Sequence, residues 1–511
     1  MTTPSETLAA IRDYFVALGA DRTAWSNAMR GSATGGPGGD GFYPLPLSDG
    51  STIQVPSVAK LIAASNAGIS AVQAITAVQG AMKIFTPEQY AAAGDAAVTS
   101  GTFVGTDDTA AVVAAYNAAK AARGTMLLSR WYRITSPLPV MSTPFAIQGP
   151  GRYLAGLVLD KSATGAAITI QDCWMGNDGD EIASPTPNVR VPGATSSGAR
   201  LRGFSILGDR ATTNVQAGIR LARRNDHLRM EDIGIYHING CALDIGYDDR
   251  AVGSRRACTR ESYIEADIKW CGNATNHAMR YVSEGGQAPF TSDDASNNNL
   301  FNLRVDNSYY GGPAILVECR NVNEIAIRND RWISLQAEGA NGDILTISGN
   351  VINSDFGGLL INPTDSGTFG IVLKEYPGHT TAAAGYDCMP RQLTFSGVDG
   401  GRTGTHGAHL IYCKNVDFTK YWPSAGRPVG GDDYHYVIET QISGRVNLGG
   451  PSGYRLNIQD NTTQSPTFVR VDPGGPLSAI SDSNAGTVSG LLPKFNAILA
   501  TLRAAGILSA R

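Results

Sequence analysis

Charge is scarce in this chain. Charged residues make up 17% of the 511 residues, the formal net charge is −4, and lysine and arginine form no cluster. Proteins that bind nucleic acid need such clusters to neutralise phosphates, so this function is excluded. The sequence has no apolar run of roughly 18 residues, the length that a membrane-spanning helix requires. Residues 1–6 are not a basic stretch followed by an apolar one, so we expect cytoplasmic synthesis and no membrane insertion.

The motifs of common enzyme and cofactor sites are missing as well. The seven cysteines form no CxxC pair, and their odd number favours reduced, buried thiols. The glycine motif at residues 36–41 contains Pro37 and follows no predicted strand, which excludes dinucleotide binding. His406 and His409 lie among glycines without a third ligand nearby, so we expect an exposed loop. The sequence therefore predicts neither a metal nor a cofactor.

Glycine, in contrast, is abundant, with 60 residues. From about residue 154 to residue 471, short runs of alternating apolar and polar residues are separated by Gly, Asn and Asp. Three runs of similar shape close on Asn307, Asn329 and Asn350, at intervals of 22 and 21 residues. These intervals suit single coils of a parallel β-helix with a left-handed residue at each corner. A β-sandwich is the alternative, but it needs frequent hairpin turns, and Asn-Gly pairs are few.

Residues 105–134 mark the beginning of this β-rich part. Asp107 and Asp108 are placed to cap the first turn of an Ala-rich helix that continues over residues 112–122. Arg123 and Gly124 end that helix. Residues 126–128 and 132–134 then predict two short apolar strands. We expect one helix that caps the start of a stack of strands.

The same segment resembles a known family. Gly94 and Asp95, the TDDTAA run at residues 106–111, and the Tyr-Arg-Ile run at residues 132–134 are similar to the opening segment of pectate-lyase-like right-handed parallel β-helices, especially those of bacteriophage tailspikes and tail fibres. The resemblance implies a mainly β, single-stranded, right-handed parallel β-helix and a homotrimer. It further implies a virion tail protein, synthesised in the host cytoplasm, that attaches to a phage tail or baseplate protein through its N-terminal region and recognises host surface polysaccharide.

Four parts follow from the residue pattern. Residues 1–95 form a helical N-terminal region, with predicted helices over residues 5–18 and 58–83, and the resemblance implies that this region attaches the protein to the virion. Residues 96–153 form the β-helix start and capping helix, and residues 154–471 form its body. Residues 472–511 form a linker and a helix over residues 491–505. This last helix either clamps the axis of a trimer or docks on its own solenoid, and the second N-terminal helix is either packed core or a short coiled coil.

Carboxylates are the best candidates for chemistry. Apolar residues occupy the even positions of residues 263–270, which places Glu265, Asp267 and Lys269 on the outer face of a strand. The same alternation places Arg304 and Asp306 outside two coils later, followed by Arg328, while Glu231 and Asp232 precede the group by one coil. Carboxylates one or two rungs apart are separated by about 5 or 10 Å, which brackets the distances that glycosidases use. The candidate residues are Glu265, Asp267 and Asp306 as acid, base or nucleophile, and Tyr309, Tyr310, Trp270, Arg304 and Arg328 as glycan-binding residues.

Two simpler interpretations compete with this site. Any solenoid carries exposed acids between Arg and Lys for solubility, which explains each acid without a function. Trp270, Trp332 and Trp422 are core or trimer-interface residues as readily as sugar platforms. The sequence therefore predicts recognition of host polysaccharide and leaves endoglycosidase activity open. A purely structural or adhesive fibre is the main alternative, and a cellular pectate-lyase-like enzyme is the third.

Overall fold

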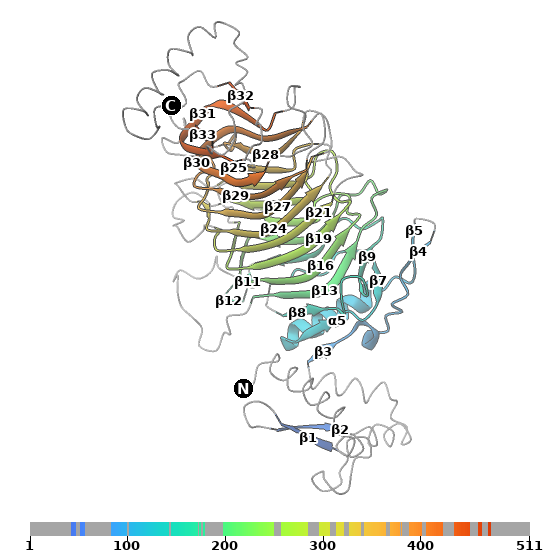
Figure 1. Ribbon diagram of the computed structural model, residues 1–511. Coiled ribbons are helices and arrows are strands. Elements are labelled where there is room, and N and C mark those ends of the chain that lie inside the picture. Colours follow the sequence, from blue (N-terminus) through green and yellow to red (C-terminus); the bar gives the residue numbers. More distant parts are fainter. Residues whose placement is uncertain are drawn as a thin grey trace, which may run out of the picture.

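The chain folds into a long stack of parallel strands (Figure 1). The computed structural model describes residues 42–46, 52–56, 83–99, 102–142, 145–171, 173–174, 177–178, 198–249, 257–284, 296–306, 313–320, 326–338, 342–363, 368–378, 380, 388–400, 405–422, 434–449, 458–461 and 469–471. The helices expected at residues 5–18, 58–83 and 491–505, and the linker before the last, lie outside these ranges except for Lys83, which is in a turn. None of the helices in the described ranges is long and apolar enough to cross a membrane.

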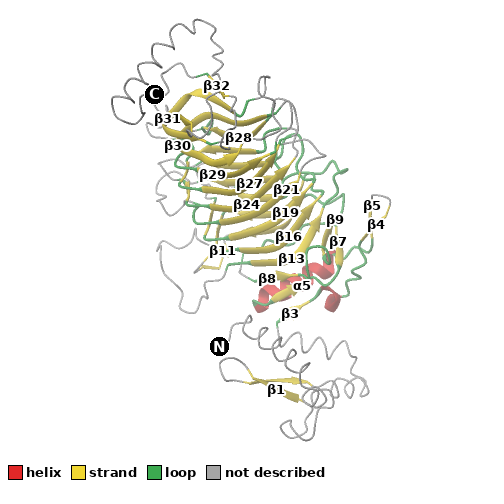
Figure 2. Cartoon of the chain, viewed as in Figure 1, coloured by secondary structure: helices red, strands yellow, loops and turns green. Residues whose placement is uncertain are grey.

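Two series of parallel strands form the walls of the solenoid (Figure 2). We call the first sheet 1; its strands are β8 (Ala146–Gln148), β13 (Arg200–Leu207), β16 (Arg229–Tyr236), β19 (Tyr263–Lys269), β21 (Leu300–Asp306), β24 (Arg331–Glu338), β27 (Asp355–Asn362) and β29 (Thr394–Asp399). We call the second sheet 2; its strands are β10 (Gly165–Gln171), β14 (Gln216–Ala222), β17 (Leu243–Tyr247), β20 (Met279–Ser283), β22 (Ile315–Cys319), β25 (Leu345–Gly349) and β28 (Phe369–Lys374). The predicted right-handed parallel β-helix is confirmed.

The last coils join the two sheets. The long strand β30 (His406–Trp422) pairs with β28 through its first half and with β29 through its second. It is followed by β31 (Tyr436–Leu448), β32 (Ile458–Asp460) and β33 (Val469–Val471), all parallel to their neighbours. His406 and His409 therefore belong to a strand and not to the exposed loop that we expected, because they pair in register with Phe369 and Val372 of β28 and are half-buried.

Short parallel pairs form a third side. These are β15 (Arg224–Asp226) with β18 (Cys258–Arg260), and β23 (Ile327–Arg328) with β26 (Val351–Ile352). The three similar runs of the sequence thus fall on β21, β23 and β25, which lie on three sides of the coil. One coil runs from Phe301 to Trp332, so the predicted interval of 22 or 21 residues between successive rungs was wrong. The runs look alike because every wall of a solenoid has the same inward and outward alternation.

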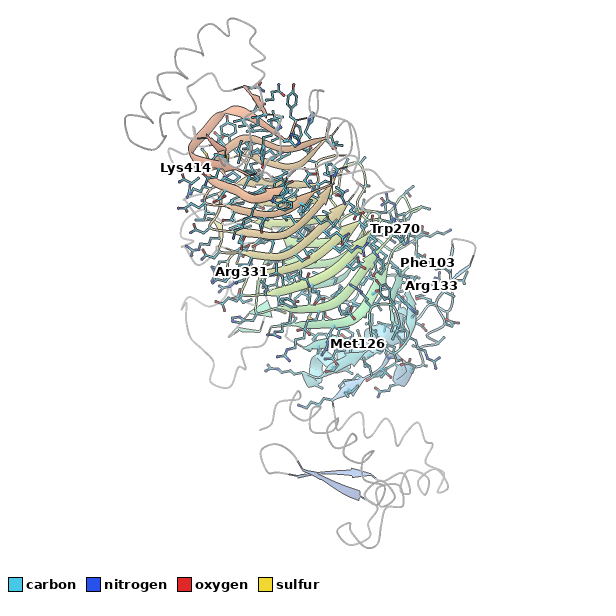
Figure 3. The ribbon with its side chains drawn as sticks, in the orientation of Figure 1. Phe103, Met126, Arg133, Trp270, Arg331 and Lys414 are labelled. Carbon is cyan, nitrogen blue, oxygen red and sulfur yellow. The ribbon has the colours of Figure 1, made fainter. Side chains whose placement is uncertain are left out.

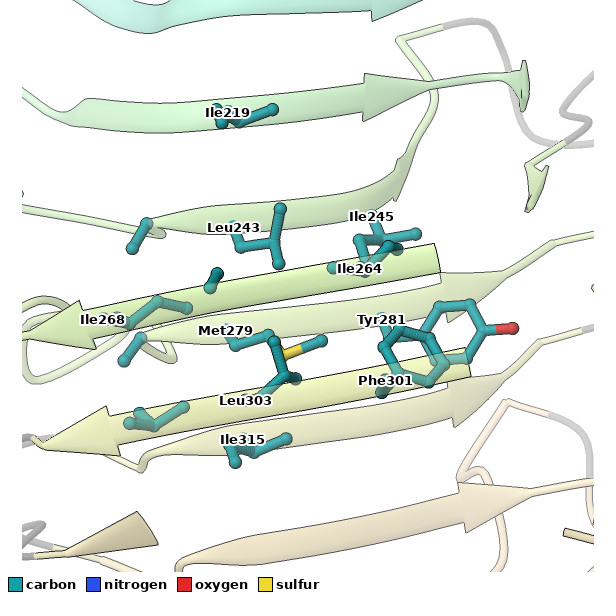
Figure 4. Close-up of a cluster of buried hydrophobic side chains, with 14 of the residues drawn as sticks. Ile219, Leu243, Ile245, Ile264, Ile268, Met279, Tyr281, Phe301, Leu303 and Ile315 are labelled. Atoms are coloured by element: carbon teal, nitrogen blue, oxygen red, sulfur yellow. The ribbon is translucent and has the colours of Figure 1, made fainter. Parts of the chain in front are cut away.

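The interior holds the even positions that the sequence predicted. Ile264, Ala266 and Ile268 of β19 are buried, and their neighbours from both sheets meet them in the close-up of Figure 4. An aromatic column continues through the rungs of sheet 1, with ring centroids 4.3 to 5.3 Å apart. Its members are Phe301, Trp332, Phe356, Phe395 and Phe418. Trp332 is therefore a core residue, which removes it from the possible sugar platforms.

The corners before sheet 1 are left-handed. Asn329 has a φ of 58°, as the sequence predicted, and Asn298 and Asn353 take the same conformation on neighbouring rungs. At the predicted corner at Asn350, Gly349 and not Asn350 has the positive φ, and Asn307 lies outside the described residues. At four of these corners the next residue is polar and buried, and its side chain accepts a backbone N–H from the preceding rung; the residues are Ser262, Asn299, Asp330 and Ser354. The corners thus stack by hydrogen bonds as well as by packing.

The start of the β-helix contains the expected helix, α5 (Thr109–Ala122), which ends at the left-handed Arg123. The two expected strands are also present as β6 (Thr125–Leu127) and β7 (Trp131–Ile134), flanked by β3 (Ile84–Phe85), the 3-10 helix η2 (Pro87–Tyr90) and β9 (Gly156–Leu159). Asp107 binds the backbone N–H of Thr109, but Asp108 does not cap the helix. Its carboxylate instead accepts the N–H groups of Ala93 and Gly94 at 2.7 and 3.0 Å.

Three antiparallel hairpins were not expected from the sequence. They are β1 (Phe42–Pro46) with β2 (Thr52–Pro56), β4 (Ala97–Thr99) with β5 (Thr102–Val104), and β11 (Cys173–Trp174) with β12 (Asn177–Asp178). The first lies in the region that we expected to be helical.

All seven cysteines are free thiols, in agreement with the sequence, and burial raises the pKa of Cys271 and of Cys413 to about 12.

Candidate functional site

The outer face of sheet 1 brings the predicted acids together. Glu265, Asp267 and Lys269 alternate with the buried residues of β19, and β21 is the next rung. The register pairs Asp267 with Arg304 and Lys269 with Asp306. Arg304 and Asp306 are thus one rung from β19, and the predicted distance of two coils was wrong. Asp267 and Asp306 are diagonal neighbours, a relationship that places Cα atoms about 7–8 Å apart.

Asp267 is not an exposed carboxylate, contrary to what its alternation suggests. Only 2% of the residue is accessible, because Arg152 and Tyr153, in the turn between β8 and β9, lie over it. Its Oδ2 accepts hydrogen bonds from the hydroxyls of Tyr153 and Tyr236, both at 3.1 Å. The Lys269 ammonium lies 3.4 Å from the same oxygen. Within the described part of the chain, Oδ1 has no hydrogen-bond partner.

The cover over Asp267 is built from stacked side chains. The rings of Tyr153 and Tyr236 are nearly parallel, with centroids 6.4 Å apart, and the Arg152 guanidinium lies 5.2 Å from the Tyr153 ring centre. Arg152 is anchored by Asp232, which lies 3.3 Å from its Nε. Tyr153 itself is 62% exposed. It therefore presents an aromatic surface to solvent while its hydroxyl reaches a buried acid.

These contacts shift the proton equilibria of the cover. Burial raises the pKa of Tyr236, and the charge of Asp267 raises it further, so this phenol stays protonated and donates. Burial lowers the pKa of Arg152. The negative charge of Asp267 and smaller contributions from other neighbours together outweigh this effect, so the pKa of Arg152 is raised. The arrangement therefore holds a neutral Tyr236 and a cationic Arg152 beside one carboxyl group.

The other two predicted acids are more accessible. Glu265 is half-buried and accepts a hydrogen bond from the Tyr263 hydroxyl at 3.1 Å. Burial raises the pKa of Tyr263, opposed by a hydrogen bond from Asn302. Asp306 is half-buried, and its backbone carbonyl accepts the N–H of Trp270 at 2.7 Å. Glu265 and Asp306 thus flank the covered Asp267 on the same face.

Trp270 lies at the corner that follows β19. It has a left-handed φ of 54°, and its ring stacks on that of His237, with centroids 4.6 Å apart. Arg210 donates a hydrogen bond to the Trp270 carbonyl at 2.7 Å. Burial, followed by the charge of Arg210, lowers the pKa of His237, which favours the neutral ring in this stack. Trp270 follows the last residue of β19, whereas Arg331 is the first residue of β24, so the two lie at opposite ends of sheet 1 strands. Figure 3 shows them on opposite sides of the stack.

The remaining predicted residues are not all part of this group. Arg304 is exposed on β21 beside Asp267, as predicted. Arg328 belongs to β23, on the third side of the coil, where it is linked to Asn297. The structure therefore separates Arg328 from the acids. Tyr309 and Tyr310 lie outside the described residues.

Sequence reasoning missed Arg152, Tyr153 and Tyr236. Arg152 and Tyr153 come from a distant turn, and Tyr153 precedes Asp267 by 114 residues. No periodicity links this turn to β19. Glu231 and Asp232 were correctly placed one coil before the acids. Asp232 anchors the turn through Arg152, and Glu231 lies between Arg202 and Arg229 at 3.7 and 3.4 Å.

The later rungs of the same face carry a column of exposed apolar side chains. Leu360, Val398 and Trp422 are register neighbours on β27, β29 and β30, and they are 37%, 44% and 52% exposed. Trp422 is therefore not a core residue of the single chain. Among the described residues, no three His, Cys, Asp or Glu side chains form a group that could hold a metal ion.

No protein-family model matches the chain, and no curated protein matches it. Three solved structures are similar in shape. Tailspike protein 2 of the Escherichia coli bacteriophage CAB120 is 14% identical with a TM-score of 0.40, over 71% of this chain and 42% of that one. The Dettilon tailspike protein is 13% identical with a TM-score of 0.38, over 78% and 68%. The A-module of a mannuronan C-5 epimerase from Azotobacter vinelandii is 14% identical with a TM-score of 0.35, over 78% and 100%. None of these similarities assigns an activity to this chain.

Proposed function

We propose that the protein is a bacteriophage tailspike or tail fibre whose outer face of sheet 1 binds a host surface polysaccharide. The observation that carries this proposal is the covered carboxyl group of Asp267 beneath an exposed tyrosine ring, between the acids Glu265 and Asp306. Sugars are bound by aromatic rings that stack on their apolar faces and by charged groups that hydrogen-bond to their hydroxyls. The tailspike class is also supported by the β-helix fold and by the resemblance of the opening segment to that of tailspike β-helices.

Cleavage of the polysaccharide is the enzymatic form of this proposal. Glu265, Asp267 and Asp306 then act as general acid, base or nucleophile at a glycosidic bond. For Asp267 to take part, Tyr153 must leave its position over the carboxylate. Adhesion without turnover is the second candidate, and the 2% exposure of Asp267 favours it.

The virion assignment extends to assembly. Residues 1–95 attach the protein to a phage tail or baseplate protein, residues 96–153 begin the β-helix, residues 154–471 recognise the host, and residues 472–511 end the chain. Three chains form the spike. The exposed column of Leu360, Val398 and Trp422 supports this trimer, because contiguous apolar surface on a β-sheet is suited to burial between subunits.

The functional test uses purified full-length protein and a panel of bacterial capsular and O-antigen polysaccharides. Binding is measured first, and release of reducing ends is then followed on each polysaccharide that binds. Release that disappears in Asp267→Asn or Asp306→Asn, and persists in Asp249→Asn, establishes the glycosidase. Asp249 is the matched control because its side chain is 62% exposed after β17 of sheet 2. Binding without release assigns an adhesive fibre, and no binding to any member refutes polysaccharide recognition.

The assembly test is the molar mass of the protein in solution by light scattering. The native protein is expected at three times the chain mass of 53.7 kDa. Trp422→Arg is expected to lower the mass, whereas Val98→Arg, at another exposed apolar site, is not. A native protein of single-chain mass contradicts the trimer.

A further inference from the structure

The exposed side chains of sheet 1 are of one chemical kind over its first rungs. In β13, β16, β19, β21 and β24, every exposed residue is an arginine except Ile333. The arginines are Arg200, Arg202, Arg229, Arg304 and Arg331. The acids of the same strands are half-buried or buried. The most exposed charged side chains of this face are therefore cationic, with less exposed acids between them, although the whole chain has a net charge of −4.

Three of these arginines share one column along the solenoid. Arg200 pairs in register with Arg229, Arg229 with Tyr263, Tyr263 with Leu300, and Leu300 with Arg331. Neighbouring rungs are about 4.8 Å apart, so Arg200 and Arg229 place like charges side by side, which is unfavourable unless an anion lies between them. Asp355 pairs with Arg331 and ends the cationic run. We call the outer face of these five rungs, with all five exposed arginines, the arginine column.

Three of the five exposed arginines have no ion-pair partner among the described residues. These are Arg200, Arg304 and Arg331. Arg202 and Arg229 share one acid, Glu231. Guanidinium groups bind carboxylate, sulfate and phosphate through two parallel hydrogen bonds, which makes unpaired arginines suited to anionic ligands.

We infer that the polysaccharide bound by this face is acidic, with carboxylate, sulfate or phosphate groups that meet the arginine column, and that it runs along the solenoid axis. The inference rests on the proposed function. Tyr263 lies within the column, between Arg229 and Arg331, and supplies a ring for the sugar between two cationic positions. This combination favours a charged glycan over a lipid surface or a nucleic acid duplex, which need no such ring at the centre of the charge.

The experiment uses the full chain and the same polysaccharide panel, with every member classed as acidic or neutral. Polygalacturonate and dextran serve as defined acidic and neutral probes. Bound members are expected to be acidic, with affinity that falls as salt is raised. Arg200→Gln and Arg304→Gln are each expected to weaken binding about tenfold, as the loss of a charge-assisted hydrogen bond predicts. Lys161→Gln removes one exposed charge from the turn between β9 and β10 and is expected to change nothing.

The outcomes separate this inference from the proposed function. Binding to neutral members alone, or equal binding by native protein and both arginine variants, overturns the acidic ligand and leaves glycan recognition intact. No binding to any member overturns both. Duplex DNA and vesicles with anionic headgroups are measured in parallel, and tighter binding to either, with the same arginine dependence, also overturns the inference.

Discussion

The Tyr153 hydroxyl donates a hydrogen bond to Asp267 at 3.1 Å, across 114 residues of sequence. This contact joins the turn between β8 and β9 to a strand that lies three rungs further along sheet 1. It turns an outward-facing carboxylate into a buried one with only one of its two oxygens bonded by described residues. The candidate site is therefore a covered acid, and its contacts lead to the first prediction.

Tyr236→Phe is expected to destabilise the fold more than Tyr153→Phe. Both hydroxyls donate to the same Asp267 oxygen, but Tyr236 is 7% exposed and Tyr153 is 62% exposed. Water replaces the lost donor at the exposed position and not at the buried one, so we expect a loss of about 1–2 kcal/mol for Tyr236→Phe and about half of that or less for Tyr153→Phe. Urea unfolding of both variants measures the difference. Equal losses contradict the described burial.

The stability of the protein is expected to rise as pH falls through neutrality, because of Asp330. Burial raises its pKa to about 7, although hydrogen bonds from Asn299 and Tyr281 act in the opposite direction. The native state therefore holds a proton that the unfolded chain releases above about pH 4, so this contribution is present below that pH and is lost as pH rises to about 7. Thermal unfolding between pH 5 and pH 8 measures the effect.

Asp330→Asn is the matched variant for the pH effect. The amide stays neutral at every pH and keeps a carbonyl oxygen for the N–H of Asn299, which lies 2.8 Å from Oδ1 in the native protein. We expect the thermal unfolding midpoint of Asp330→Asn to depend less on pH than that of the native protein. The midpoint of the native protein should therefore rise relative to that of the variant as pH is lowered. Parallel pH profiles for the two proteins would show that Asp330 does not hold the proton.

Gly246→Ala is expected to destabilise sheet 2 more than Gly165→Ala. The two glycines have nearly the same left-handed φ, 86° and 87°. A Cβ at Gly246 meets the carbonyl oxygen of Val282 on β20, whereas at Gly165 its nearest contact is the Pro137 side chain at 3.8 Å. Strain alone costs each variant about 1–2 kcal/mol, and the clash adds about 1–3 kcal/mol to Gly246→Ala. Equal unfolding midpoints would contradict the close approach of β17 and β20.

The alternation of apolar and polar residues was enough to predict the β-helix and the inward residues of β19. It was not enough to predict the length of a coil, because the loops between rungs differ. The coil from Phe301 to Trp332 is longer than the coil from Trp332 to Phe356.

Asp108 shows a second limit of prediction from the sequence. Its position before α5 predicts a helix cap, but its carboxylate binds the backbone at Ala93 and Gly94, a contact that depends on the tertiary fold.

In the candidate site, too, local geometry could be predicted from the sequence and tertiary contacts could not. Glu265, Asp267 and Lys269 share a face because of local geometry, which the sequence displays. The burial of Asp267 depends on Arg152 and Tyr153, whose approach is determined by the path of a distant turn. The arginine column likewise depends on the register of strands that are separated by loops of different lengths. Such relationships follow from the assembled solenoid and not from any single segment.

Hydroxyl-radical footprinting with a bound polysaccharide tests most directly whether the outer face of sheet 1 is the recognition surface. The account predicts that Tyr153 and Tyr263 become less reactive when the polysaccharide is added, since one lies over Asp267 and the other in the arginine column. Tyr90, 36% exposed at the end of η2, serves as the internal control and is expected to keep its reactivity. Protection elsewhere on the chain, with Tyr153 and Tyr263 unchanged, would contradict the account.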